Sequence, residues 1–108
     1  GTVHKGPPGQ LHYVASKSAV LGMSRSMARE LGGDNIQVNT ISPSLTMSEG
    51  VLANPAWEPF KKNLAETRII QRDMLPTDLV GTALFLASSD SDFLTGQSVN
   101  VDGGVQLT

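Results

Sequence analysis

Tyr13 and Lys17 are the two residues of this sequence whose types and spacing could together perform proton chemistry. They stand four positions apart, and on an α-helix that spacing places both side chains on one face, one turn apart. A neighbouring cation favours the phenolate and lowers the pKa of a tyrosine from its ordinary value of about 10. Tyr13 could then exchange a proton with an alcohol or a developing alkoxide near neutral pH. The alternative interpretation is an ordinary exposed pair on a helix surface, because short motifs of this kind also occur without function.

Length and composition argue against several other classes of function. The chain has 108 residues, enough for one small domain, and a net charge of −2 without a basic cluster, which argues against nucleic acid as a partner. No apolar run is long enough to span a bilayer, and no signal peptide is visible. The absence of cysteine is consistent with a cytoplasmic protein. Neither His4 nor His12 has a cysteine or a carboxylate cluster beside it, so we expect no metal site.

The elements that must position the Tyr13–Lys17 pair can be predicted from periodicity and from turn residues. We expect a loop over residues 1–12 and a helix over residues 12–31, where apolar residues recur at helical spacing and a left-handed glycine cap at Gly32-Gly33 ends the pattern. β-branched residues predict a strand over residues 36–41. A second helix is predicted from Pro76 to about Ser88, followed by a second strand over residues 97–101.

The order helix, strand, lid segment (residues 49–72), helix, strand indicates an α/β fold with two parallel strands joined by a right-handed crossover. Two parallel strands do not make a stable sheet, because parallel sheets need helices on both faces. We therefore interpret the chain as half of an α/β domain. Residues 49–72 are expected to be irregular because Pro55 and Pro59 break any long helix, although residues 60–67 could form a helical turn or two.

Two segments carry candidate binding residues in addition to the Tyr13–Lys17 pair. The loop after the first strand contains Thr46 and Ser48, and ligands of α/β sheets bind at the carboxyl ends of strands, although a polar turn would look the same. Residues 49–72 have the length of a substrate lid. The lone Trp57 fits either a substrate-facing anchor or a hydrophobic plug. The candidate lid residues are Leu52, Trp57 and Phe60.

Five motifs occur in an order and spacing that are specific when taken together. They are Tyr13-x-x-x-Lys17, Asn39-x-Ile41-x-Pro43, Pro76-x-Asp78-Leu79, Thr95-Gly96-Gln97 and Val101-Asp102-Gly103-Gly104. On these motifs the chain resembles the carboxyl-terminal half of a short-chain dehydrogenase/reductase, over nearly its whole length. The resemblance implies that residues 1–108 are the carboxyl-terminal portion of one Rossmann domain, a doubly wound, Rossmann-like parallel sheet that binds NAD or NADP and whose amino-terminal half is absent here, with residues 49–72 as its substrate lid.

The resemblance also implies roles for single residues. Tyr13 would be the general acid/base, while Lys17 would lower the pKa of Tyr13 and hydrogen-bond the nicotinamide ribose. The loop from Pro43 to Ser48 would cover the nicotinamide carboxamide. Ser44 stands where the family usually has glycine, so we expect the loop to sit differently here. The candidate cofactor-binding residues are therefore Tyr13, Lys17, Pro43, Ser44, Thr46 and Ser48.

Two functions follow from these observations. The first is an oxidoreductase that transfers a hydride between NAD(P) and a small-molecule carbonyl or secondary alcohol. We expect this activity of the parent protein, whereas these 108 residues alone would be inactive unless the missing amino-terminal half is supplied. A 3-oxoacyl thioester, a secondary alcohol, a sugar and a steroid remain open as substrates. The second is a truncated, non-catalytic fragment that only self-associates or packs with a missing amino-terminal half, through its exposed helix and sheet edge. By resemblance, we also expect a homodimer or tetramer formed through the helix at 12–31 and the region 76–104.

Overall fold

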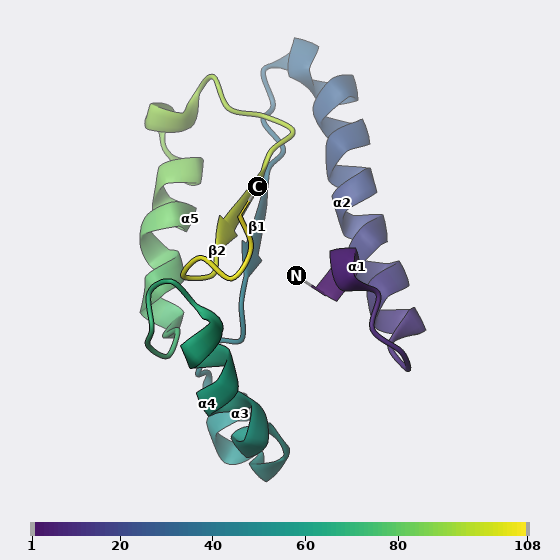
Figure 1. Cartoon of the computed structure of the whole chain (residues 1–108). Coiled ribbons are helices and arrows are strands. Elements are labelled where there is room, and N and C mark those ends of the chain that lie inside the picture. The colour runs from purple at the N-terminus through teal and green to yellow at the C-terminus, as the bar shows by residue number, and fades with distance from the viewer. Residues whose placement is uncertain (1, 108) are drawn as a thin grey trace.

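The computed structural model describes residues 2–107, which form helices on either side of a two-stranded sheet (Figure 1). The α-helices are α1 (Thr2–Lys5), α2 (Leu11–Leu31), α3 (Glu49–Ala53), α4 (Glu58–Thr67) and α5 (Val80–Ala87). The strands are β1 (Thr40–Pro43) and β2 (Ser98–Val101), and short 3₁₀ turns span Gly32–Asp34, Pro55–Trp57, Pro76–Leu79 and Ser89–Ser91. The α/β fold class and the order of elements predicted from the sequence are confirmed.

The two strands pair in parallel, with Thr40 opposite Ser98 and Pro43 opposite Val101. In Figure 1, α5 and α2 lie on opposite sides of the strands, which is the arrangement that a parallel sheet requires. The helices α3 and α4 lie beyond the end toward which both strands point. The segment that joins β1 to α5 therefore occupies the carboxyl end of the sheet, where ligands of α/β proteins bind.

Two predictions at the amino-terminal side of the chain need correction. Residues 1–12 are not all loop, because α1 spans Thr2–Lys5 and α2 begins at Leu11; Gly1 lies outside the described residues. The left-handed residue after α2 is not a glycine. Gly32 is right-handed with φ −58°, and its N–H donates to the Ala28 carbonyl, while Asn35 adopts φ 60°. Asparagine tolerates this region of backbone space better than other side chains do, so the stop comes three residues later than expected.

The strand predicted over residues 36–41 begins only at Thr40, so its first four residues were wrongly assigned. Side-chain hydrogen bonds hold this part of the chain in place of a strand ladder. Asn39 Nδ2 donates to the Leu94 carbonyl at 2.8 Å, and its Oδ1 accepts from the Gln97 N–H at 3.1 Å. The segment before β2 is thus bound by an amide side chain, which periodicity does not reveal.

The lid region is more helical than its sequence suggested. Proline is tolerated in the first turn of a helix, where its missing N–H would have no partner anyway, and Pro55 and Pro59 both occupy such positions. Ser48 caps α3 by accepting from the Val51 N–H at 3.4 Å. Asn54 caps the next turn by accepting from the Ala56 N–H at 3.0 Å. The two prolines therefore prevent one long helix in this region, but each also stands in the first turn of a short one.

Little of the apolar surface is enclosed in the described part of the chain. The buried apolar residues are Ala28, Met47 and Met74. The expected packing positions on α2 remain open, with 48% of Val20, 59% of Met23 and 38% of Met27 exposed. The radius of gyration is 15.5 Å, whereas a compact domain of this length has about 13 Å. No helix within residues 2–107 is long and apolar enough to cross a bilayer.

Candidate active site

Tyr13 and Lys17 lie on one face of α2, as their spacing predicted. The Lys17 ammonium sits 5.6 Å from the centre of the Tyr13 ring, within the range of a cation–π contact. Tyr13 is 43% exposed. Neither the phenol nor the ammonium has a hydrogen-bond partner among residues 2–107. The pair is therefore assembled and free to bind a ligand.

The loop after β1 has its polar groups engaged locally. The Thr46 hydroxyl donates to the Ser44 carbonyl at 3.0 Å, and the Ser48 N–H donates to the Thr46 carbonyl at 2.8 Å. Ser48 is exposed and caps α3, yet its own O–H remains available to a ligand. Pro43 ends β1 and is exposed. Within the described residues, no hydrogen bond or ion pair connects this loop with the Tyr13–Lys17 pair.

The three candidate lid residues lie at the surface. Leu52 and Phe60 are each 59% exposed, and Trp57 is 39% exposed. The rings of Trp57 and Phe60 meet edge to face, with their centroids 6.2 Å apart. An edge-to-face aromatic pair forms a small rigid apolar surface. The half-exposed Trp57 ring thus belongs to a surface that a ligand could contact.

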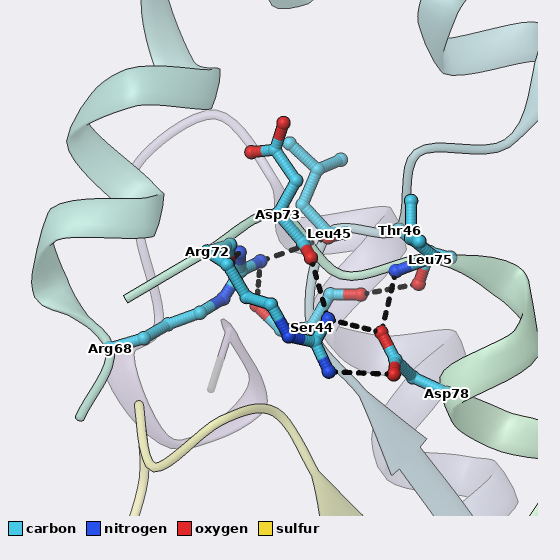
Figure 2. Close-up of polar contacts among 8 residues, drawn as sticks. All are labelled: Ser44, Leu45, Thr46, Arg68, Arg72, Asp73, Leu75 and Asp78. Atoms are coloured by element: carbon cyan, nitrogen blue, oxygen red, sulfur yellow. Dashed lines mark hydrogen bonds and ion pairs between the residues drawn. The ribbon is translucent and has the colours of Figure 1, made fainter. Parts of the chain in front are cut away.

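Sequence reasoning missed a network of two arginines and one aspartate between the lid and α5 (Figure 2). Arg72 donates two hydrogen bonds to the Asp78 carboxylate, at 2.7 and 2.8 Å, and the Leu75 N–H donates a third at 2.8 Å. Arg68 is almost completely buried and binds the loop after β1. The sequence placed Asp78 only within the Pro76-x-Asp78-Leu79 motif, because its partners are not apparent from local sequence.

These hydrogen bonds shift the pKa values of the Arg72–Asp78 ion pair. The bond from Arg72, followed by that from the Leu75 N–H, holds the pKa of Asp78 well below its ordinary range. The hydrogen bond and charge of Asp78 raise the pKa of Arg72 in turn. The charged form of each side chain is therefore the form that the fold stabilises.

The lowered pKa of Asp78 predicts a stability contribution that is lost in acid. Because this pKa is lower in the folded state, the contribution is complete above the unfolded value of about 3.9 and disappears as the pH falls through the folded value. Asp78→Asn should therefore unfold at a lower temperature than the unaltered protein at neutral pH, and the difference should shrink in acid. Thermal unfolding across the acid range measures this. A difference that stays constant with pH would contradict the assignment, and added salt should weaken it because the pair is near solvent.

The pocket beside this network does not contain the Tyr13–Lys17 pair. Its volume is about 160 Å³, and it is lined by Arg68, Ile70, Arg72, Asp73, Met74, Asp78, Val101 and Gly103. None of the residues expected to bind cofactor lines it. His4 and His12 are both exposed, and no cluster of three or more potential metal-binding side chains occurs within residues 2–107.

The parallel strands, the intervening lid and the Tyr-x-x-x-Lys pair on the preceding helix match the class of short-chain dehydrogenases/reductases. A family model described as enoyl-(acyl carrier protein) reductase matches residues 2–106. The chain belongs to this family of short-chain dehydrogenases/reductases, which confirms the resemblance drawn from its motifs.

Proteins of more than one activity are similar to this chain. It is 38% identical over 106 residues to a 3-oxoacyl-[acyl-carrier-protein] reductase of Thermotoga maritima, covering 94% of this chain and 41% of that protein. It is 42% identical over 101 residues to a 3α-hydroxysteroid dehydrogenase of Mediterraneibacter gnavus, covering 94% of this chain and 40% of that protein. The chain therefore spans about two-fifths of the length of these curated relatives.

Solved structures agree with this assignment. The crystal structure of a 3-oxoacyl-[acyl-carrier protein] reductase from Brucella melitensis with bound NAD is 32% identical and superposes with a TM-score of 0.76, covering 91% of this chain and 34% of that one. Other similar structures are complexes with NADH and with NADPH. The fold described above is thus shared with proteins that bind a nicotinamide cofactor.

Proposed function

We propose that this chain contributes the proton-transfer residues of an oxidoreductase that moves a hydride between NAD(P) and a carbonyl or secondary-alcohol substrate. The observation that carries the proposal is the free Tyr13–Lys17 pair, with the Lys17 ammonium above the tyrosine ring. Tyr13 would donate a proton to the oxygen of a carbonyl being reduced and accept it in the reverse direction. A bound nicotinamide would supply or accept the hydride.

The groups that are available fit a nicotinamide nucleotide. The ammonium of Lys17 offers three donors without a partner among the described residues, which suits the hydroxyls of a ribose. The Ser48 O–H is exposed at the carboxyl end of β1, which suits an amide oxygen. Thr46 would shape the loop rather than donate, because its hydroxyl already donates to the Ser44 carbonyl. Pro43 has no N–H and would also only shape the loop, and Ser44 would contact the cofactor from the same turn.

The substrate class is proposed only as a carbonyl or secondary alcohol. The reductase relative is named for a 3-oxoacyl-[acyl-carrier-protein] and the dehydrogenase relative for a 3α-hydroxysteroid. Leu52, Trp57 and Phe60 offer an apolar lid surface that would accommodate the apolar body of either. The proposal also includes a dimer or tetramer formed through residues 12–31 and 76–104, because the apolar face of α2 is exposed. The cytoplasmic location stays a prediction.

That exposed face favours a second candidate function. Val20, Met23 and Met27 present apolar side chains to solvent on α2, and β2 has an unpaired edge in the two-stranded sheet. Such surfaces favour association with another chain. A non-catalytic chain that only self-associates would use them without needing Tyr13 or Lys17.

Nucleotide binding separates the two candidates. In a protein that carries both halves of the domain, NADH and NADPH fluorescence titrations should show binding of at least one nucleotide, and Lys17→Ala should weaken it by on the order of tenfold because a charged hydrogen bond is lost. Lys62→Ala is the matched control, since Lys62 is an exposed lysine on α4 with no partner among the described residues. Oxidation of the bound nucleotide by a 3-oxoacyl thioester or a 3-ketosteroid would then identify the substrate. Folded protein that self-associates but binds neither nucleotide would support the non-catalytic candidate.

A further inference from the structure

Arg68 connects the end of the lid to the loop after β1, which is the loop assigned above to the cofactor. It directly follows α4, and only 3% of its surface is exposed. Its Nη2 donates to the Leu45 carbonyl at 3.0 Å and to Ser44 Oγ at 3.3 Å. Its Nη1 donates to the Arg72 carbonyl at 2.7 Å. The Arg68 guanidinium thus binds Arg72 at the end of the lid as well as Ser44 and Leu45 in the loop after β1 (Figure 2).

The burial of the Arg68 charge depends on the conformation of the loop that it binds. All three acceptors are neutral oxygens, no carboxylate forms an ion pair with Arg68 in the described part of the chain, and its Nε has no partner there. Removing a charge from water is costly unless it is well bonded. Arg68 can therefore stay buried only while the carbonyls of Leu45 and Arg72 point at it, so its burial and the loop conformation depend on each other.

The turn after β2 closes over the same side chain. The Ile70 N–H donates to the Gly103 carbonyl at 2.9 Å. A Cβ on Gly103 would lie 3.1 Å from Arg68 Cδ, so the glycine lets the backbone approach the arginine closely. Arg68 is consequently packed between the segments that follow both strands, which leaves its guanidinium little freedom to turn away.

A second connection holds the rest of the loop and does not involve Arg68. The Met47 N–H donates to the Met74 carbonyl at 2.7 Å, and Thr46 forms an isolated parallel bridge with Met74. Loss of the guanidinium should therefore release Ser44 and Leu45 while Met47 stays fixed. This difference distinguishes a local positioning role from a general loss of stability.

We propose that Arg68 is a positioning residue that fixes Ser44 and Leu45 against the end of α4 and thereby sets the loop that binds the cofactor. The Ser44 hydroxyl, which stands where the family usually has glycine, is one of its acceptors and so becomes part of the connection. The effect on cofactor affinity rests on the proposed function, whereas the effect on loop order does not.

The test compares Arg68→Gln with Arg72→Gln by backbone ¹⁵N relaxation and by nucleotide titration. Rigid backbone gives order parameters of about 0.85 and flexible backbone gives less than about 0.6. We expect the order parameters of Ser44 and Leu45 to fall into the flexible range in Arg68→Gln, that of Met47 to stay high, and the NAD(P)H dissociation constant to rise on the order of tenfold. Arg72→Gln removes an arginine of the same network but leaves all three Arg68 hydrogen bonds, so it should change neither quantity.

The outcomes separate this inference from the proposed function. Unchanged order at Ser44 and Leu45 in Arg68→Gln overturns the positioning role, whether or not nucleotide binds. Loss of order there, in a protein that never binds nucleotide, supports the positioning role and contradicts the proposed function. If Arg68→Gln does not fold, Arg68→Lys takes its place, because lysine keeps the charge but cannot reproduce the planar fork. Increased mobility at Ser44 and Leu45 in that variant supports the inference, and retained order overturns it.

Discussion

Replacing Tyr13 by phenylalanine is expected to lower the turnover number of the complete enzyme by about 10²–10⁴-fold, the usual contribution of a general acid or base. The variant loses only the hydroxyl, so its ring can keep its place under the Lys17 ammonium. Nucleotide binding should therefore remain close to that of the unaltered protein. Steady-state turnover and a separate nucleotide titration, made on the same preparation, measure the two effects independently.

The neighbouring His12 provides the control for this experiment. It is exposed and directly precedes Tyr13 on α2, and histidine is the side chain that most often acts as a general acid or base, so it is the nearest alternative proton donor in the sequence. His12→Gln should leave turnover essentially unchanged. Turnover that survives in Tyr13→Phe, or that is lost in His12→Gln instead, would remove Tyr13 from the proposed mechanism.

Gly104→Ala should destabilise the fold by roughly 2–5 kcal/mol, the largest stability effect that the structure predicts for a single methyl group. Gly104 has φ 87°, which is unfavourable for alanine. The added Cβ would also lie 2.9 Å from Ile69 Cβ, a contact that cannot be relieved by rotating the end of a side chain. Urea unfolding, followed by circular dichroism, gives the change in the free energy of unfolding.

Two other glycines separate the causes of this effect. Gly6 also has positive φ, 55°, but nothing lies within 4 Å of its added Cβ, so Gly6→Ala should show the backbone cost of about 1–2 kcal/mol alone. Gly22 lies within α2 with open space around it, and Gly22→Ala should stabilise the helix by up to about 1 kcal/mol. Equal effects at Gly104 and Gly6 would show that the Ile69 contact is relieved without cost.

The sequence was most informative where a pattern repeats over many residues. The helix over residues 12–31 could be predicted almost to its ends because its apolar spacing continues for several turns, and the α/β class followed from the order of elements. The strand at 36–41 was misplaced because β-branched residues favour extended backbone whether or not a ladder forms. Here the Asn39 side chain, not the ladder, binds the chain to Gln97, and that partner is distant in sequence.

The candidate site also contains residues that local sequence predicts and residues that it does not. Tyr13 and Lys17 could be paired from sequence because a helix turn fixes their separation. The partners of Arg68 could not be predicted from sequence, because its acceptors Ser44 and Leu45 lie 24 and 23 residues away and no local periodicity connects them. A charged residue reads as exposed from sequence alone, and only the fold shows that this one is buried.

The large separation of the two paired strands along the sequence has a consequence for how the lid can change in evolution. Asn39 and Gln97, which meet where the parallel ladder begins, are 58 residues apart, and the whole lid lies between them. The entropy lost when such a long connection closes grows only logarithmically, so doubling its length costs about 0.6 kcal/mol more. Lids that differ in length and composition can therefore be exchanged at small cost to strand pairing. Evolution can alter what the lid recognises while Tyr13 and Lys17, which precede the connection, keep their places.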